Sequence, residues 1–497
     1  MVKRALWMVL GVLLLLAAAV AVNTLRQGSR QLQVPPAPSI AVDEAAAADR
    51  LAGAIRFRTV SSLEQPQLNA DQFRGLHAYL QQRYPRVHAT LKREVVGELG
   101  LLYTWPGSDA NTRPIALIAH HDVVPVAPGT EAAWTVPAFD GAVKDGYVWG
   151  RGAWDDKGNL IAQLEAIEML LAAGFQPRQT VFLVSGADEE VGGARGAAAI
   201  ARLLRERRVH LDFVLDEGLV ITQGVIPGVA APTALVGVAE KGYVSVQLKA
   251  AAAPGHSSMP PPPGTSAIAR LGAALQRLEQ EQFPAALQGV GREMFETLAP
   301  EMGGLQRVVL SNLWLFGPLA QRQLEQGAGT NAMLRTTTAL TIVHAGNKEN
   351  VIPGVAEATV NFRILPGETR ETVLRRVRAV VGDGIELKEL AGGADPSPVT
   401  STGSPSYRLI QRTLRELFPG TIVTPALYIA GSDSQHFIGL TDAIYRFSPV
   451  RANAADLPRL HGTNERLATA NLADLVRFYH QLLREASAAP ATNSVSP

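Results

Sequence analysis

Residues 180–190 read TVFLVSGADEE, an apolar run that ends in three consecutive acids. Val181 to Val184 form an uncharged stretch, which is typical of a strand inside a sheet that is covered on both faces. Asp188, Glu189 and Glu190 follow almost at once, and neighbouring carboxylates repel one another. A strand that ends in this way would destabilise the fold unless a cation neutralised the acids, so the stretch predicts a cation site.

Two further apolar runs lead into histidine or acidic residues. They are IALIA (115–119), followed by His120, His121 and Asp122, and LDFVLDEG (211–218), which ends at Asp216, Glu217 and Gly218. Helical patterns separate these runs, and strands that alternate with helices predict an α/β fold with a mostly parallel sheet. Because ligands of such sheets bind beyond the carboxyl ends of the strands, we expect these side chains to meet at one edge.

The pattern changes at about residue 238. From there to residue 392 it follows the order strand–helix–strand–strand–helix–strand, which is typical of a small α+β, ferredoxin-like domain. Residues 280–330 have no place in that order and indicate an insertion. The α/β pattern returns after about residue 393. We therefore predict a catalytic domain of residues 42–237 and 393–485, interrupted by a smaller domain of residues 238–392.

The N-terminus carries Lys3 and Arg4 before an uncharged apolar run from Ala5 to Val22. The run is close to the roughly 20 residues that a membrane-spanning helix needs and is longer than the usual core of a signal peptide. Ala19-Val20-Ala21 nevertheless resembles a cleavage site. We expect residues 1–26 to anchor the protein in a membrane with its body outside the cytoplasm, or to be the signal of a secreted protein if they are cleaved.

The remaining composition limits the partners of the chain. The Pro-rich stretch QVPPAPS predicts a linker over residues 27–41, and residues 486–497 have the composition of a disordered tail. Lys and Arg number 46 and Asp and Glu 45, so the net charge of +1 provides no field for binding nucleic acid. The chain has no cysteine, which excludes disulfides, thiolate metal ligands and a thiol nucleophile.

Five side chains with imidazole nitrogen or carboxylate oxygen donors are candidate metal ligands: His120, Asp155, Glu190, Asp216 and His461. Such donors suit zinc or a similar divalent ion. Five ligands exceed what one tetrahedral zinc with an open position needs. They suit two metals that share a bridging carboxylate and a bridging water.

Asp122 and Glu189 lie beside these candidates in the sequence. Asp122 follows His120 by two residues, so its carboxylate can orient the imidazole. Glu189 precedes Glu190, and successive side chains diverge, so Glu189 can face the water and act as a general base. Two neighbouring glutamates are then useful because one binds a metal and the other moves a proton.

Each of these residues alone has a plainer interpretation. A histidine after a strand is more often a hydrogen-bonded structural residue. Asp155-Asp156-Lys157 before a helix resembles an N-cap, and an acidic cluster such as residues 188–190 often begins a helix. Asp216-Glu217-Gly218 matches ordinary turn chemistry. Their convergence at the ends of successive strands favours a metal site over these alternatives.

Six motifs occur in order: AHHDVVPV (119–126), GRGAWDDKGN (150–159), GADEEVGG (186–193), VLDEG (214–218), GHSSMPP (255–261) and RLHGTNERL (459–467). With them, residues 45–485 resemble the di-zinc aminoacylase and carboxypeptidase family. LSNLWLF (310–316) and IYRFSPV (444–450) resemble its carboxypeptidase S branch, which includes N-fatty-acyl-amino-acid synthase/hydrolases. The resemblance implies a zinc-exopeptidase-like catalytic domain interrupted by a lid or dimerisation domain.

The resemblance also implies a role for each residue of the site. His120 and Asp216 match the ligands of one zinc, and Glu190 and His461 match the ligands of the other. Asp155 matches the bridging carboxylate, which precedes a cis peptide bond. Glu189 matches the general base, and Asp122 matches the residue that orients the first histidine. Cobalt or manganese can replace zinc in such donor sets. His121 departs from the family pattern, and we expect it to point away from the metals.

The substrate-binding residues rest on the resemblance rather than on spacing. His256 matches a histidine that stabilises the oxyanion and that many relatives take from the partner subunit, which implies a homodimer. Arg363 matches an arginine that binds the substrate's terminal carboxylate. Asn331, Asn350 and Ser432 match polar positions near the substrate. Taken alone, His256 is a loop residue that caps a turn and Arg363 is a surface arginine.

The expected chemistry is hydrolysis of an amide bond next to a free carboxylate. Two substrates fit: an N-acyl amino acid, including long-chain N-fatty-acyl amino acids that are hydrolysed or condensed, and a peptide with an exposed C-terminus, as for a carboxypeptidase or dipeptidase. An alternative from another class is a catalytically silent, membrane-tethered metal-binding protein. The presence of all five ligands and of Glu189 argues against that alternative.

Overall fold

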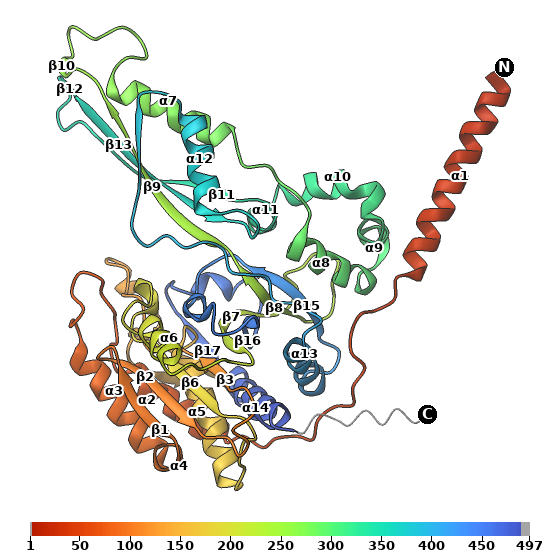
Figure 1. Ribbon diagram of the computed structural model, residues 1–497, viewed down its shortest axis with the longest axis vertical. Coiled ribbons are helices and arrows are strands. Elements are labelled where there is room, and N and C mark those ends of the chain that lie inside the picture. The colour runs from red at the N-terminus through yellow and green to blue at the C-terminus, as the bar shows by residue number, and fades with distance from the viewer. Residues whose placement is uncertain (1, 489–497) are drawn as a thin grey trace.

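The computed structural model describes residues 2–488, which form two main sheets (Figure 1). The strands of the larger sheet, in order across it, are β1 (Lys92–Val96), β2 (Gly100–Trp105), β6 (Val181–Ser185), β3 (Ile115–Ile118), β7 (Val214–Thr222), β16 (Ile444–Ala452), β8 (Thr233–Glu240) and β15 (Ile422–Tyr428). Strands β6, β3, β7 and β16 at its centre run parallel, as do β8 and β15, whereas the β1–β2, β2–β6 and β16–β8 pairs are antiparallel. The predicted α/β fold is confirmed, with a mixed sheet.

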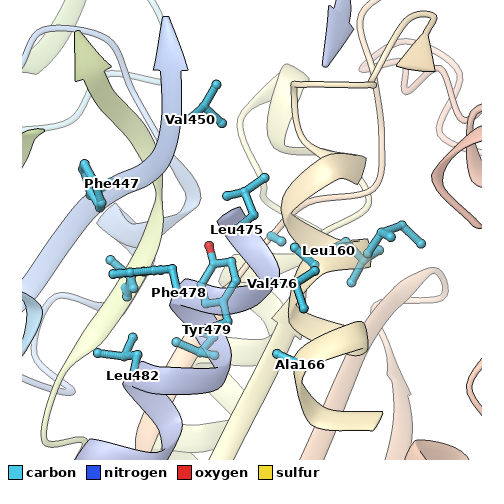
Figure 2. Packing of buried hydrophobic residues seen from close by; sticks show 14 of the residues in the cluster. Leu160, Ala166, Phe447, Val450, Leu475, Val476, Phe478, Tyr479 and Leu482 are labelled. Atoms are coloured by element: carbon cyan, nitrogen blue, oxygen red, sulfur yellow. The ribbon is translucent and has the colours of Figure 1, made fainter. Parts of the chain in front are cut away.

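Helices cover both faces of the large sheet, because alternate residues of its strands are apolar on opposite sides. Leu117 and Leu183 pack in one cluster with helices α2 (Glu44–Ile55), α3 (Ala70–Arg83), α4 (Pro85–Thr90), α5 (Lys157–Ala172), α13 (Pro405–Leu417) and α14 (Thr469–Ala486). Ile118 and Val184 face the other side and pack against α6 (Ala197–Glu206). Figure 2 shows α14 and α5 side by side in the first cluster. The sheet therefore has a core on each face.

The smaller sheet has four antiparallel strands in the order β11 (Thr337–Ala345), β13 (Val355–Ile364), β9 (Gly242–Ala251) and β14 (Ile385–Glu389). Two helices, α7 (Ala267–Gln280) and α12 (Arg370–Val381), pack on it in a separate apolar cluster. Along the chain these elements follow the order strand–helix–strand–strand–helix–strand. The short pair β10 (Gly255–His256) and β12 (Val351–Ile352) extends from the far end of this unit (Figure 1).

The stretch without a place in the expected order, residues 280–330, contains helices that continue to residue 334. They are α8 (Gly289–Leu298), α9 (Gly304–Ser311), α10 (Leu313–Leu324) and α11 (Ala328–Leu334). Phe295 and Leu298 of α8 pack against Ile422 and Ala426 of β15. These helices thus lie within residues 238–392 in sequence, but α8 joins the edge of the large sheet. The contact is between apolar surfaces far apart in the chain, so the local pattern did not reveal it.

Helix α1 (Val2–Arg26) projects from the rest of the molecule (Figure 1). By length and composition it is the one described helix that can cross a membrane. Residues 27–41, the predicted linker, are hydrogen-bonded to the body. The Gln31 side chain accepts from Val423 N at 2.7 Å and donates to Val423 O at 3.1 Å. It thereby occupies backbone groups of β15, the edge strand of the large sheet.

A third, three-stranded sheet positions two loops of the site. It consists of β17 (Arg466–Ala468), β5 (Tyr147–Trp149) and β4 (Ala142–Lys144), with β17 antiparallel to β5. The strand expected to end near Gly218 instead continues to Thr222. Beyond Asp216 its pairing with β16 shifts register, and it then pairs with β8. Asp216 therefore lies at an irregularity inside β7 rather than at the end of a strand.

Candidate metal centre

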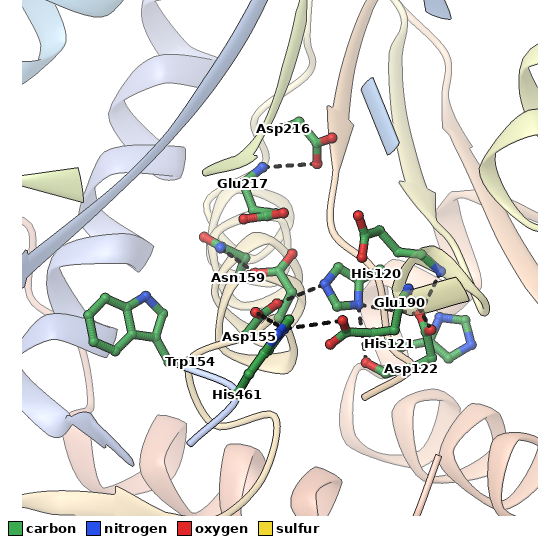
Figure 3. A network of polar contacts seen from close by, with 12 residues as sticks. His120, His121, Asp122, Trp154, Asp155, Asn159, Glu190, Asp216, Glu217 and His461 are labelled. Carbon is green, nitrogen blue, oxygen red and sulfur yellow. Dashed lines mark hydrogen bonds and ion pairs between the residues drawn. The ribbon is translucent and has the colours of Figure 1, made fainter. Parts of the chain in front are cut away.

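Four of the five predicted metal ligands meet at one edge of the large sheet (Figure 3). His120 follows β3, Glu190 lies in the 3-10 turn after β6, Asp155 precedes α5, and His461 belongs to the loop before β17. Gly192 and Gly193 have φ values of +100° and +66°, which turn the chain away after Glu190. A Cβ at Gly193 would lie 2.2 Å from Asp433 Oδ1, so this turn has no room for a side chain.

Asp155 stands between the two histidines. Its Oδ1 lies 2.9 Å from His120 Nε2, and its Oδ2 lies 3.1 Å from His461 Nε2. His461 Nε2 is also 3.1 Å from Glu190 Oε2. The ligand atoms of His120, Asp155 and Glu190 all lie within 4.8 Å of one another. A carboxylate with one oxygen toward each imidazole has the placement that a bridging ligand requires.

Asp216 is not part of that closest group of three, but it is buried beside it. Its Oδ2 accepts from Ser434 N at 2.7 Å, and its Oδ1 accepts from Glu217 N at 2.9 Å. Burial raises the pKa of Asp216 to about 6. Two backbone donors thus fix the orientation of this carboxylate next to the other acids.

The arrangement of charged groups at the site favours the binding of a cation. Hydrogen bonds to Asp155 and Glu190 raise the pKa of His461 to about 10. Burial disfavours the charged form of His120, yet contacts with Asp122 and Asp155 raise its pKa well above the ordinary value. The surrounding carboxylates therefore favour positive charge at both imidazoles when no metal is bound, and a bound metal ion would supply that charge instead.

The donor set fits a divalent metal. It offers imidazole nitrogen and carboxylate oxygen, and the buried Glu190 Oε1 has no hydrogen-bond partner among the described residues. An unpartnered buried carboxylate oxygen is costly unless something coordinates it. Zinc and similar borderline ions prefer these ligand types. His120, Asp155, Glu190 and His461, with Asp216 beside them, could hold such ions.

The carboxylate of Asp122 contacts both His120 and the turn that carries Glu189 and Glu190. This fully buried carboxylate lies 3.3 Å from His120 Nδ1 and accepts from Ser61 Oγ at 2.7 Å. It also accepts from the backbone N–H groups of Glu189 at 3.1 Å and Glu190 at 3.2 Å. One carboxylate therefore orients the imidazole and holds the turn that carries both glutamates.

Glu189 has surroundings different from those of Glu190. Among the described residues its carboxylate makes no hydrogen bond, whereas Glu190 pairs with His461. Burial and the carboxylates of Glu190, Asp122 and Asp155 raise the pKa of Glu189 well above its ordinary value. A carboxylate with a raised pKa that is free of partners is suited to accept a proton near neutral pH.

His121 points away from this centre, as expected. Its Nε2 lies 3.1 Å from His77 Nε2, and its Nδ1 lies 2.8 Å from Ser185 Oγ. All of these groups are buried. The peptide bond between Asp155 and Asp156 is cis, which also agrees with the expectation.

A buried ion pair that the sequence analysis missed holds two loops of the centre together. Arg151 Nη1 donates to Glu465 Oε2 at 2.6 Å, and its Nη2 donates to the His461 carbonyl at 3.1 Å. The other Glu465 oxygen accepts from Trp154 N and Asp155 N at 3.0 and 3.1 Å. Both residues lie in quoted motifs, but single charges in loops usually indicate a solvated surface.

The residues expected to bind substrate are divided between the two ends of the smaller unit. His256 and Asn350 lie at its outer tip, where Ser257 N donates to Asn350 O at 3.1 Å and His256 Nδ1 lies 2.8 Å from Ser258 Oγ. Figure 1 shows β10 and β12 far from the strands that carry the metal ligands. Within one chain, the structure therefore does not bring His256 to the centre.

Arg363 lies at the end of β13 that is nearer the large sheet, with its guanidinium 4.9 Å from the Tyr243 ring. No carboxylate among the described residues lies within ion-pair distance of it. Lys241, between β8 and β9, donates to the carbonyls of Ala332 and Arg335, both at 2.8 Å. It thereby links the strand connection to α11, which carries Asn331.

Ser432 is fully buried, and its surroundings differ from those expected of a substrate contact. Its hydroxyl donates to Glu240 Oε2 at 3.0 Å and lies 2.7 Å from Ser434 Oγ. Glu240 in turn accepts from Arg446 Nε at 2.9 Å. Because Ser434 N holds Asp216, this geometry fits a role in supporting the metal centre.

Comparisons with known proteins identify the family to which the chain belongs. A family model described as Peptidase family M20/M25/M40 matches residues 116–485. The chain is 42% identical to N-fatty-acyl-amino acid synthase/hydrolase from Xenopus tropicalis over 90% of its length and 86% of that protein. It is 38% identical to a probable carboxypeptidase S-like protein from Dictyostelium discoideum, over 96% and 92% of the two chains.

A solved structure shares the fold. The M20 family metallo-carboxypeptidase from Sulfolobus solfataricus superposes with a TM-score of 0.67 at 16% identity, covering 90% of this chain and 100% of that chain. The family model spans most of the sequence, and the relatives match almost all of it. The chain therefore belongs to peptidase family M20/M25/M40 and is a metallohydrolase.

Proposed function

We propose that this enzyme hydrolyses, and in reverse forms, the amide bond of N-acyl amino acids, with long fatty acyl chains preferred. The observation that carries the proposal is the 42% identity to an N-fatty-acyl-amino acid synthase/hydrolase over 90% of the chain. The sequence contains all five candidate ligands, and the Glu189 carboxylate has no hydrogen bond among the described residues, which supports an active enzyme rather than a silent metal-binding protein.

We assign the cofactor as two zinc ions. His120 and Asp216 would hold one, Glu190 and His461 would hold the other, and Asp155 would bridge them. Bound zinc would supply Lewis-acid polarisation of the scissile carbonyl and lower the pKa of the attacking water. Cobalt or manganese would suit the same donors.

The chain's own groups carry the proton transfers. Glu189 accepts a proton from the attacking water, whose oxygen bonds to the amide carbon. It then passes this proton to the leaving nitrogen as the carbon–nitrogen bond breaks, which yields a carboxylic acid and a free amino acid. Asp122 keeps Glu189 in place through the backbone of the turn, because it accepts from Glu189 N at 3.1 Å.

Recognition of the substrate carboxylate is assigned to Arg363, with Asn331 nearby on α11. An arginine without an ion-pair partner suits a planar carboxylate. We assign the donor that stabilises the oxyanion to His256 of a second copy of the chain, because His256 lies at the outer tip of its own chain. Asn350, beside His256, would enter the site with it. The exposed edge strand β11 supports a homodimer through the smaller sheet.

We assign a separate role to the domain built on each of the two main sheets. We propose that residues 42–237 and 393–485 form the catalytic domain and that residues 238–392 form a lid and dimerisation domain that closes over the substrate. Residues 1–26 would anchor the protein with its body outside the cytoplasm. Cleavage of this segment would release it as a secreted protein.

A second candidate substrate is a peptide with a free C-terminus. The 38% identity to a carboxypeptidase S-like protein favours it, and Arg363 would bind a peptide C-terminus as well as an acyl amino acid. The two substrates share the carboxylate and differ in what lies on the acyl side of the amide.

A substrate panel on the zinc-loaded full chain tests the proposal. N-acetyl- and N-oleoyl-amino acids are compared with dipeptides and C-terminally blocked peptides, with and without a chelator. Chelator-sensitive release of amino acid, fastest from N-oleoyl compounds, is expected. Faster cleavage of unblocked peptides would establish the carboxypeptidase alternative. Two bound metals without turnover of any compound would contradict both.

A further inference from the structure

Helices α9 and α10 expose three large apolar side chains to solvent. Leu305, Trp314 and Leu319 are 76%, 60% and 62% exposed. Between Met302 and Gln321 the only charged residue is Arg307. Exposed large apolar side chains on two neighbouring helices, with so few charges in the segment, favour a contact surface over ordinary surface composition. We call this surface, defined by Leu305, Trp314 and Leu319, the α9–α10 face.

The junction between these helices is fixed to the end of α1. Asn23 Nδ2 donates to the Ser311 carbonyl at 2.7 Å, and Gln27 Nε2 donates to the same carbonyl at 2.9 Å. Asn312 Nδ2 donates to Thr24 Oγ1 at 2.9 Å. Ser311 and Asn312 are buried, so the last turn of α1 has a specific polar contact with the body.

That contact places the α9–α10 face where α1 ends. The apolar run of α1 stops at Val22, one residue before Asn23. Figure 1 shows α9 beside the lower end of α1 and α10 next to α9. Arg307, the one charged residue between Met302 and Gln321, also contacts the end of α1, because its Nη2 donates to the Gln27 carbonyl at 3.3 Å. Trp314 has the amphipathic side chain that is enriched at membrane interfaces.

We propose that the α9–α10 face lies in the interface of the same lipid bilayer that α1 crosses, so that the enzyme is held to the membrane at two points. Its occupant is lipid rather than a second copy of the chain. The face is continuous with α1, whose apolar window is fully uncovered in the structure. The surface proposed for the homodimer, by contrast, is on β11 of the smaller sheet.

The absence of cysteine allows this proposal to be tested at single positions in the full chain. Leu319→Cys and Leu305→Cys are each labelled with a fluorophore that reports polarity, and the protein is placed in vesicles with or without a quencher attached to the lipid chains. Leu63→Cys, 70% exposed in the loop before α3, is the matched control on the catalytic domain. Leu13→Cys reports on α1 itself.

We expect the Leu319 and Leu305 labels to shift to shorter wavelength and lose emission with the quencher, as the Leu13 label does, while the Leu63 label is unchanged. Quenching at Leu13 with none at Leu319 or Leu305 would overturn the proposal and leave the anchor intact. Energy transfer between two copies labelled at Leu319, without lipid quenching, would instead assign the face to a protein interface. The test does not depend on turnover, so a failure of the proposed function leaves its result unchanged.

Discussion

Glu189 and Glu190 occupy one 3-10 turn but have different surroundings. Glu190 pairs with His461 and keeps one oxygen unpartnered, whereas the Glu189 carboxylate has no hydrogen bond among the described residues. The difference arises because successive side chains diverge while Asp122 holds both backbone N–H groups. The two residues are of the same type, so the direction of each side chain determines its role.

Replacing Glu189 by Gln should therefore separate proton transfer from metal binding. The amide keeps the size of the side chain but cannot accept the proton, so we expect turnover to fall by about 10²–10⁴-fold or more. Metal content, measured by elemental analysis, should stay unchanged. Glu190→Gln is the matched control and should lose metal. An active Glu189→Gln enzyme would remove Glu189 from the mechanism.

A second residue-scale prediction concerns the buried pair His77 and His121. Burial lowers the pKa of His77 to about 4 from 6.5, so above pH 6.5 both folded and unfolded states are neutral at this group. As the pH falls from 6.5 to 4, the unfolded chain takes up a proton that the folded chain excludes. The free energy of unfolding should decrease over that range by up to about 3 kcal/mol.

His77→Gln keeps a hydrogen-bonding group beside His121 but does not titrate. Thermal unfolding at about pH 7 and about pH 4.5 should thus show a larger loss of stability in the natural protein than in the variant. Equal losses would mean that other groups account for the acid sensitivity. His121, whose pKa burial also lowers, remains in both proteins.

At the scale of elements, the edge strand β15 shows how far-apart segments complete the fold. Helix α8 covers one face of β15 through apolar contacts, and the Gln31 side chain of residues 27–41 binds backbone groups on its open edge. An uncovered edge strand would expose backbone groups that can pair with other chains. The predicted linker of residues 27–41 therefore protects the edge of the sheet.

Gln31→Ala should destabilise the protein by about 1–3 kcal/mol, because the buried N–H and C=O of Val423 lose their partner. Urea unfolding measures the change, and faster proteolysis within residues 27–41 should accompany it. Gln33→Ala, at an exposed position of the same segment, is the control and should have little effect. Equal stability of both variants would show that water satisfies Val423.

Sequence reasoning was sufficient where local patterns determine structure. Alternating strands and helices predicted the large sheet, and the order strand–helix–strand–strand–helix–strand predicted the smaller one. Histidine and acidic residues after apolar strands predicted that His120 and Glu190 meet at one sheet edge. Asp155, which precedes a helix, was expected there from its donor type and from the family resemblance. It was not sufficient for the Arg151–Glu465 pair or the docking of α8 on β15. Those contacts join residues more than 100 positions apart, and neither partner has a local signal that distinguishes it from surface. Asp216 was identified, but its place inside β7 depends on a register shift set by β16 and β8.

At the scale of the whole molecule, the proposed site needs two chains. His256→Ala and Glu189→Gln should each be nearly inactive, since each removes one group from every site. Co-expression of the two variants should restore activity, because a mixed dimer has one site with Glu189 from one chain and His256 from the other. A lost oxyanion donor alone costs about 10²–10³-fold, so recovery should be easily measured. No recovery in a purified mixed dimer would assign His256 to its own chain.

The position of α14 has a consequence for biosynthesis. This helix, the last in the described part of the chain, packs against α2 and α5 and contributes Leu475, Val476 and Leu482 to the largest apolar cluster. The smaller sheet and its helices are complete by residue 389 and have a core of their own. During translation the interrupting unit can fold first, whereas the catalytic core is completed only after α14 has left the ribosome.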